Sequence, residues 1–148
     1  MFGAPGHAYV YFTYGMHHCF NVVCGRTGRP TAVLVRALEP LVGLEAMAAR
    51  RGIHSVGRLT RGPGALAQAL GLRREHNGLD LARGPVWVAD LPAVRAAERV
   101  ARGPRIGIRL AAERPWRYWL AGSAFVSRGP HAAAAATAAR RTRTREPR

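Results

Sequence analysis

Three tyrosines near the start of the chain have the types and spacing best suited to chemistry. Tyr9 and Tyr11 lie two residues apart in an aromatic and β-branched run, so in a strand they share one face. Tyr14 follows, next to a glycine at an expected turn. Tyrosine rings on a sheet face can stack on nucleobases, at ~1–3 kcal/mol per base, and a bulky side chain at a turn can wedge into a duplex. Composition alone favours the alternative, in which Tyr9 and Tyr11 pack in the core.

Histidines and cysteines cluster in the same region. His7 shares the face of the two tyrosines and could approach a bound base, although a surface role is the commoner one for such a histidine. His17 and His18 are adjacent, so in a strand they point to opposite faces and cannot both bind one metal ion. Cys19 and Cys24 would need a geometry that a strand does not provide. We therefore expect no metal site.

A glycine-rich segment at residues 62–64 is the other candidate binding feature. Gly62, Pro63 and Gly64 open an expected helix, whose first N–H groups can hold a phosphate. The segment lacks the lysine and the serine or threonine of a P-loop, which argues against nucleotide hydrolysis. An ordinary proline-started helix is the alternative. The eight carboxylates form no visible acid pair, and no serine–histidine–aspartate arrangement is visible.

Periodicity predicts the elements that must position these residues. Strands at 8–13 and 17–24 should form a hairpin with residues 14–16 near its tip, followed by a turn at 25–30. The other expected elements are a strand at 31–36, helices at 41–51 and 63–70 that end at glycines, and strands at 86–89, 105–110 and 116–121. We expect an α+β (mixed α/β) single domain, with a mainly antiparallel curved sheet, a protruding β-hairpin and surrounding helices.

Charge and length restrict the function further. The chain has 148 residues and a formal net charge of +15, and all 23 of its basic residues are arginines. Such a charge favours polyanionic partners. No apolar run reaches the ~20 residues of a membrane span, and two cysteines are too few for a disulfide framework. We expect a cytoplasmic protein that binds nucleic acid, with a domain at 1–130 and a disordered Ala/Arg-rich basic tail at 131–148.

Several separate segments, in order, resemble the alkyladenine (3-methyladenine) DNA glycosylase family, and the resemblance covers nearly all of residues 1–128. The matching segments are PGHAYVY (5–11), YGMHHC (14–19), NVV (21–23), VLVRALEP (33–40), LTRGPG (59–64), PRIGI (104–108), RPWR (114–117) and FVSR (125–128). The resemblance implies a monomeric base-excision enzyme that flips alkylated or deaminated purines out of double-stranded DNA. It would hydrolyse the N-glycosidic bond with water, and therefore needs no cofactor or metal.

The resemblance also assigns roles to individual residues. Tyr11 would stack on the flipped base, with Tyr9 and His7 beside it in the base pocket. Asn21 would line that pocket and reject the exocyclic amino group of guanine. Tyr14 would fill the hole left in the base stack from the minor-groove side.

Further roles concern the DNA around the lesion. Met16 and His17 would contact DNA beside the wedge, and Arg36 would lie near the backbone of the extruded nucleotide. Gly62 and Gly64 would contact a phosphate.

The family's general-base glutamate lies in a segment upstream of the position that corresponds to Met1. No acid in this chain matches it, so we expect Met1 to be internal to a longer reading frame, or the chain to be a truncated remnant. The alternative function is therefore a non-catalytic DNA-binding remnant, with salt-sensitive duplex binding and little excision. An unrelated basic RNA-binding protein is a third possibility, favoured by charge alone.

Overall fold

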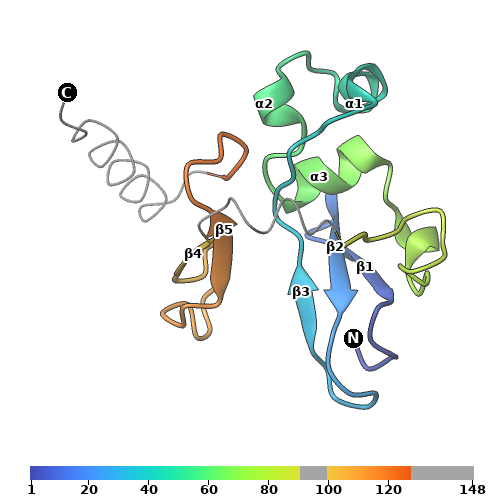
Figure 1. Cartoon of the computed structure of the whole chain (residues 1–148), viewed down its shortest axis with the longest axis vertical. Helices are drawn as coiled ribbons and strands as arrows, with labels where there is room; N and C mark the ends of the chain where they lie inside the picture. The colour runs from blue at the N-terminus through green and yellow to red at the C-terminus, as the bar shows by residue number, and fades with distance from the viewer. Residues whose placement is uncertain (91–99, 128–148) are drawn as a thin grey trace. The chain divides into compact units, whose positions relative to one another are not determined.

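The computed structural model describes residues 1–90 and 100–127. The chain divides into two compact units, Met1–Asp90 and Leu91–Arg148 (Figure 1). The expected basic tail at 131–148 lies outside the described residues, and the domain boundary at 130 stays a prediction. No helix in the described ranges is long and apolar enough to cross a membrane.

The first unit is built on a three-stranded antiparallel sheet in the order β1-β2-β3. Its strands are β1 (Ala8–Thr13), β2 (His17–Val23) and β3 (Ala32–Leu34). The predicted hairpin and its tip are confirmed, and its register sets Tyr9 opposite Asn21 and Tyr11 opposite Cys19. β3 is shorter than predicted, although the Val35 N–H still donates to the Phe20 carbonyl at 3.0 Å.

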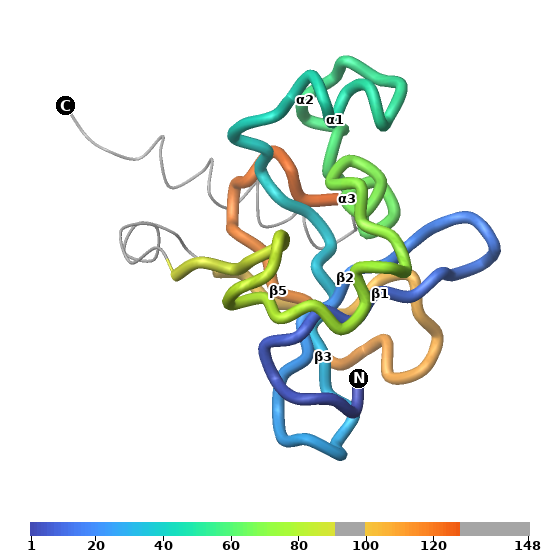
Figure 2. Tube along the Cα trace, turned by 90° about the vertical axis from the view of Figure 1, so that its right-hand side faces the viewer, coloured from blue at the N-terminus to red at the C-terminus, as the bar shows by residue number. Residues whose placement is uncertain are grey.

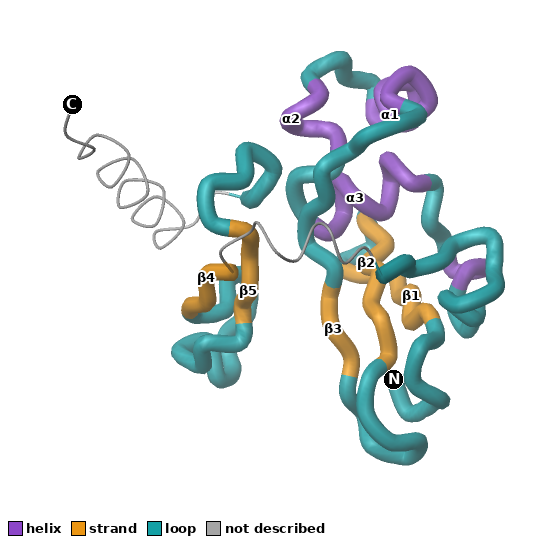
Figure 3. The backbone as a smooth tube through the Cα atoms, in the orientation of Figure 1, coloured by secondary structure: helices purple, strands orange, loops and turns teal. Residues whose placement is uncertain are grey.

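Three helices and a 3₁₀ turn follow the sheet (Figure 3). They are α1 (Leu44–Arg51), α2 (Val56–Leu59), α3 (Pro63–Leu70) and η1 (Arg74–His76). The predicted ends are confirmed: Gly52 and Gly71 cap α1 and α3 in the left-handed region, with φ of 63° and 69°. α1 starts three residues later than predicted, because its N-cap, Gly43, has a φ of 73° that no helix continues through.

The core of this unit lies between one face of the sheet and α3. Its buried members alternate along the strands and recur at helical spacing, as a shared apolar interface requires. They are Ala8, Val10, Phe20, Leu66, Ala67, Leu72 and Leu81. Tyr9 and Tyr11 are half-buried and are not members of this cluster, because strand alternation turns them to the other face of the sheet.

The outer edge of β1 is covered near its start. Ala8 exchanges backbone hydrogen bonds with the following loop: its N–H donates to Leu79 and its carbonyl accepts from Gly78, both at 2.8 Å. The Val10 N–H donates to the Asn77 side chain at 3.0 Å. These bonds fix the base of the hairpin, while its tip extends away from α3 as the blue loop of Figure 2.

The second unit contains an antiparallel pair, β4 (Val100–Gly103) and β5 (Arg117–Leu120). The predicted strand at 116–121 is confirmed by β5, so the fold is α+β with antiparallel sheets. The predicted strands at 86–89 and 105–110 are wrong. Residues 81–88 form a turn, in which the Val88 N–H donates to the Leu81 carbonyl. Residues 104–112 form a loop, because the Arg105 guanidinium donates to the carbonyls of Leu110 and Ala111.

Candidate nucleic-acid interface

The hairpin tip exposes two large apolar side chains. Tyr14 is 86% exposed and Met16 is 68% exposed, although both are of types that usually avoid water. Tyr14 and Gly15 are the centre of a tight turn, closed by the Met16 N–H on the Thr13 carbonyl at 3.1 Å. Tyr14 has a φ of 51°, a left-handed conformation that is strained for a non-glycine residue. A bulky ring held at a strained, solvent-facing turn suits contact with a partner better than folding.

Tyr9 and Tyr11 lie in β1, the strand that leads into this turn. The rings of Tyr9 and Tyr11 are stacked, with centroids 5.3 Å apart and planes 30° apart. Asn21, opposite Tyr9, is buried, and its side-chain amide donates to the Tyr9 carbonyl at 3.0 Å. That bond uses one amide hydrogen and fixes the side chain. Aromatic faces and an oriented amide therefore share one side of the hairpin.

Three ionisable side chains from neighbouring strands meet beside this pair. Burial raises the pKa of the Tyr11 hydroxyl. The Cys19 thiol opposite it raises this pKa further, through an electrostatic interaction and a side-chain hydrogen bond. Burial lowers the pKa of Arg36, which follows β3, and the nearby Cys19 and Tyr11 act in the opposite direction. Arg36 is thus placed next to the stacked tyrosines, and at neutral pH its guanidinium carries the positive charge of the group.

Arg36 has an unusual environment for an arginine. Its Nε atom is buried and has no hydrogen-bond partner among residues 1–90 and 100–127. An unpaired buried donor costs about 1–3 kcal/mol, so this N–H group lowers the stability of the described fold. An anionic partner beside Tyr11 would supply the missing charge compensation.

The remaining predicted residues lie around this group. His7 is half-buried, and its Nδ1 lies 3.2 Å from the Pro5 carbonyl, so it is engaged with the N-terminal segment. The N–H of Gly62 donates to the Arg36 carbonyl at 3.0 Å, so this N–H is not free to bind a phosphate. A phosphate contact at this helix start would therefore use the N–H groups of Gly64 and Ala65, which an α-helix leaves without intrahelical acceptors.

The raised pKa of Tyr11 makes a prediction for stability at alkaline pH. The folded chain keeps this proton where the unfolded chain has released it, so the group's contribution to stability is complete below about pH 10 and is lost as pH rises through the folded pKa. Tyr11→Phe should therefore lose less stability than the wild type between about pH 9 and pH 11 in urea melts. An equal loss in both proteins would contradict this account of Tyr11.

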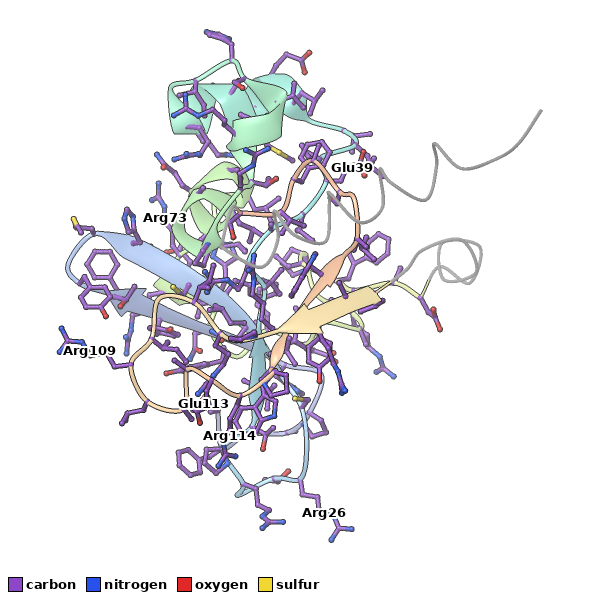
Figure 4. The ribbon with its side chains drawn as sticks, turned by 90° about the vertical axis from the view of Figure 1, so that its left-hand side faces the viewer. Arg26, Glu39, Arg73, Arg109, Glu113 and Arg114 are labelled. Atoms are coloured by element: carbon purple, nitrogen blue, oxygen red, sulfur yellow. The ribbon has the colours of Figure 1, made fainter. Side chains whose placement is uncertain are left out.

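The second unit carries a separate cluster of arginines on tryptophans. The guanidinium carbons of Arg105 and Arg114 lie 5.2 and 4.7 Å from the centroid of the Trp116 ring, and that of Arg117 lies 4.9 Å from Trp119. These distances are those of cation–π contacts. Arg117 is buried and also donates to the Ser127 carbonyl at 2.8 Å. The cluster orders the loop between β4 and β5, from which Arg109 and Arg114 extend in Figure 4.

The described carboxylates all lie at the surface. Glu39, Glu45, Glu75, Asp80, Asp90 and Glu113 are all exposed. Glu39 lies well away from the tip of the hairpin in Figure 4. Among the described residues, Cys19 and Tyr11 are the side chains that raise the pKa of Arg36, against the lowering by burial. Within the described ranges, no three metal-binding side chains come together.

Two features of the site escape sequence reasoning. Cys19 draws attention in the sequence only as a possible metal ligand, yet it lies directly opposite Tyr11. The signal is present in the sequence, because fixing the turn at residues 14–16 also fixes that pairing. The other feature is a close approach of Gly64 to His17, which brings α3 against the start of β2. No local pattern reports a contact between residues 47 positions apart, so only the fold could show it.

The comparisons with known proteins point to one family. The sequence model of the family described as methylpurine-DNA glycosylase matches residues 1–124. A Rhodopseudomonas palustris protein is 54% identical over 128 residues, covering 86% of this chain and 62% of its own length. A Granulibacter bethesdensis protein is 52% identical, and the match covers 86% of this chain and 60% of that protein. A Methanoculleus marisnigri protein is 50% identical, and the match covers 86% of this chain and 68% of that protein. All three carry 3-methyladenine DNA glycosylase in their names. The chain thus spans roughly three fifths to two thirds of the relatives it matches.

Proposed function

This chain belongs to the methylpurine-DNA glycosylase family, and we propose that it binds double-stranded DNA at the β1–β2 hairpin and turns a damaged purine out of the helix. One observation carries this proposal: Tyr14 is held at the hairpin tip in a strained, exposed conformation, on the same hairpin as a stacked tyrosine pair that lies beside the half-buried Arg36. The pattern combines a wedge, a stacking surface and a cation, which are the parts that base extrusion requires.

In the proposed complex Tyr14 enters the duplex from the minor groove and occupies the space of the extruded purine. The unstacking of a base step costs a few kcal/mol, and ring contacts made by the inserted side chain offset part of that cost. The base then stacks on Tyr11, whose ring is already ordered by Tyr9. Asn21, fixed by its bond to the Tyr9 carbonyl, would oppose the amino group of guanine and so select against that base.

Other residues would hold the DNA backbone. Arg36 would sit near the phosphate of the extruded nucleotide, where its charge is compensated. Met16 and His17 flank the wedge, and both are exposed. The N–H groups at the start of α3, around Gly64, would donate to a second phosphate. The net charge of +15 would add sequence-independent attraction to the duplex.

The proposed reaction is the hydrolysis of the N-glycosidic bond by a water molecule that gives its proton to a general base. The family resemblance implies that this base is a glutamate. Every carboxylate in the described ranges is exposed, and none of them is a cause of the pKa shifts of Tyr11 and Arg36. This observation favours a second candidate function for the 148-residue chain: binding and extruding the damaged base with little cleavage, because loss of a positioned base typically costs ~10²–10⁴ in rate.

The direct test is fluorescence anisotropy with matched duplexes that carry adenine or hypoxanthine at one position, followed over a salt series. We expect tighter binding to the hypoxanthine duplex and weaker binding to both duplexes as salt rises. Single-turnover excision on the same duplex separates the two candidate functions. Excision means that the chain is a glycosylase, binding without excision means the second function, and equal affinity for both duplexes would refute both.

A further inference from the structure

The first turn of α3 makes a tight glycine contact with the hairpin at His17, next to its tip. A Cβ built on Gly64 would lie 2.9 Å from Cγ, 3.1 Å from Cβ and 3.2 Å from Nδ1 of His17. Distances below 3.0 Å are essentially never observed for a real Cβ. The atoms in the way include the Cβ and Cγ of His17, which move only if β2 or the side-chain rotamer moves. Gly64 therefore leaves a space in the helix surface that the imidazole fills.

A contact at His17 can affect the position of the hairpin tip. It is the first residue of β2 and directly follows the tip residues 14–16, which carry Tyr14 and Met16. It is also paired with Thr13, the last residue of β1. A displacement of His17 would therefore be passed to both ends of the turn, and so to the orientation of the Tyr14 ring.

The neighbouring glycine makes a second link from the same segment. Gly62 has φ 115° and ψ 151°, a conformation that L residues rarely adopt, and its N–H donates to the Arg36 carbonyl at 3.0 Å. Pro63 stands at the first helical position, where its fixed φ stiffens the entry to α3. One short segment, residues 62–64, thus contacts the backbone of Arg36 at one end and the side chain of His17 at the other.

We propose that Gly64 is a positioning residue, which holds the Tyr14 hairpin in place by letting α3 pack against His17. The inference rests on the proposed function for its effect on DNA, but the contact itself can be tested without DNA. Gly64 acts through the close approach of α3 to β2 and supplies no contact to the base. Its substitution should therefore change the hairpin's orientation while leaving the core of Leu66 and Val10 intact.

The test compares Gly64→Ala with Gly57→Ala in the full chain. Gly57 lies in α2, and a Cβ there would meet only the end of the Arg61 side chain, at 3.7 Å. Both changes add one methyl group to a helix, where alanine is preferred to glycine. Gly64→Ala should shift the backbone amide NMR signals of residues 13–17 and weaken binding to the hypoxanthine duplex about five- to tenfold, as the displacement of a packed group does. Gly57→Ala should do neither.

A double variant separates positioning from general damage. His17→Ala removes the Cγ and Nδ1 atoms that a Cβ at position 64 would meet, so adding Gly64→Ala to His17→Ala should cost little further affinity. Additive losses in the double variant, or unchanged hairpin signals in Gly64→Ala, would overturn the inference. If the hairpin signals shift as expected while the wild type shows no preference for hypoxanthine, the contact stands and the proposed function is the part that fails.

Discussion

Replacing Tyr14 with glycine should weaken binding to a hypoxanthine duplex by about 10–100-fold, because the change removes a side chain that stacks at ~1–3 kcal/mol in the space of the lost base. The fold should keep its stability within ~1 kcal/mol, since glycine relieves the left-handed strain at φ 51° that an L residue bears there. Anisotropy titrations and urea melts of the same samples measure the two quantities.

Measuring DNA affinity and folding stability separately distinguishes a DNA-binding role of Tyr14 from a structural one. Tyr118, on β5, is another mostly exposed tyrosine and serves as the control, so Tyr118→Ala should preserve the preference for the damaged duplex. A Tyr14→Gly protein that binds hypoxanthine and adenine duplexes in the wild-type ratio would show that the hairpin tip does not enter the helix. A large loss of stability would instead mean that Tyr14 has a structural role.

Replacing Arg36 with methionine should raise the stability of the free protein by ~1 kcal/mol while it weakens DNA binding by about 10–100-fold. The gain arises because the buried Nε lacks a hydrogen-bond partner among the described residues, whereas methionine needs none. The loss arises because a charge-assisted phosphate contact, worth about 1.5–3 kcal/mol, disappears. The slope of log K against log salt should also fall by about one unit.

Arg26 provides a matched control for this substitution. It lies in the turn between β2 and β3 and projects outward, as Figure 4 shows. Arg26→Met changes the net charge by the same amount, so it should weaken binding only slightly and leave the free energy of unfolding unchanged. Equal losses of affinity in the two variants would mean that Arg36 contributes only net charge, and would remove it from the proposed site.

The hairpin could be predicted from the sequence because its signals are local. An aromatic and β-branched run, a Tyr-Gly turn and a second such run determine both strands and the tip, and with them the shared face of Tyr9 and Tyr11. Pro63 and Gly71 mark α3 in the same way, one at each end. Each of these inferences needs only one short continuous stretch of the chain.

The two wrongly predicted strands, at 86–89 and 105–110, have specific causes. Residues 105–110 have the composition of a strand, but the Arg105 side chain binds the carbonyls of Leu110 and Ala111 and closes a loop instead. The apolar residues at 86–89 lack a strand partner in the described chain, and the Val88 N–H turns back to Leu81. Both outcomes depend on particular hydrogen bonds between residues five to seven positions apart, which β-propensity does not describe.

The site could be predicted as a set of residues but not as a geometry. The family resemblance assigns roles to Tyr11, Asn21 and Arg36, but it implies neither the position of Cys19 opposite Tyr11 nor the packing of His17 against Gly64. Contacts of this kind join residues far apart in sequence whose types are individually ordinary. They become visible only when strand register and helix packing are known.

The central claim is that this chain extrudes a damaged base, and imino-proton NMR of a duplex with one hypoxanthine–thymine pair tests it most directly. On addition of one equivalent of the full chain, the account predicts loss of the imino signals of that pair while signals of more distant pairs persist. The Tyr14→Gly variant at saturating concentration should restore much of the lost signal. Saturating binding by the wild type with the hypoxanthine–thymine imino signals intact would contradict the account.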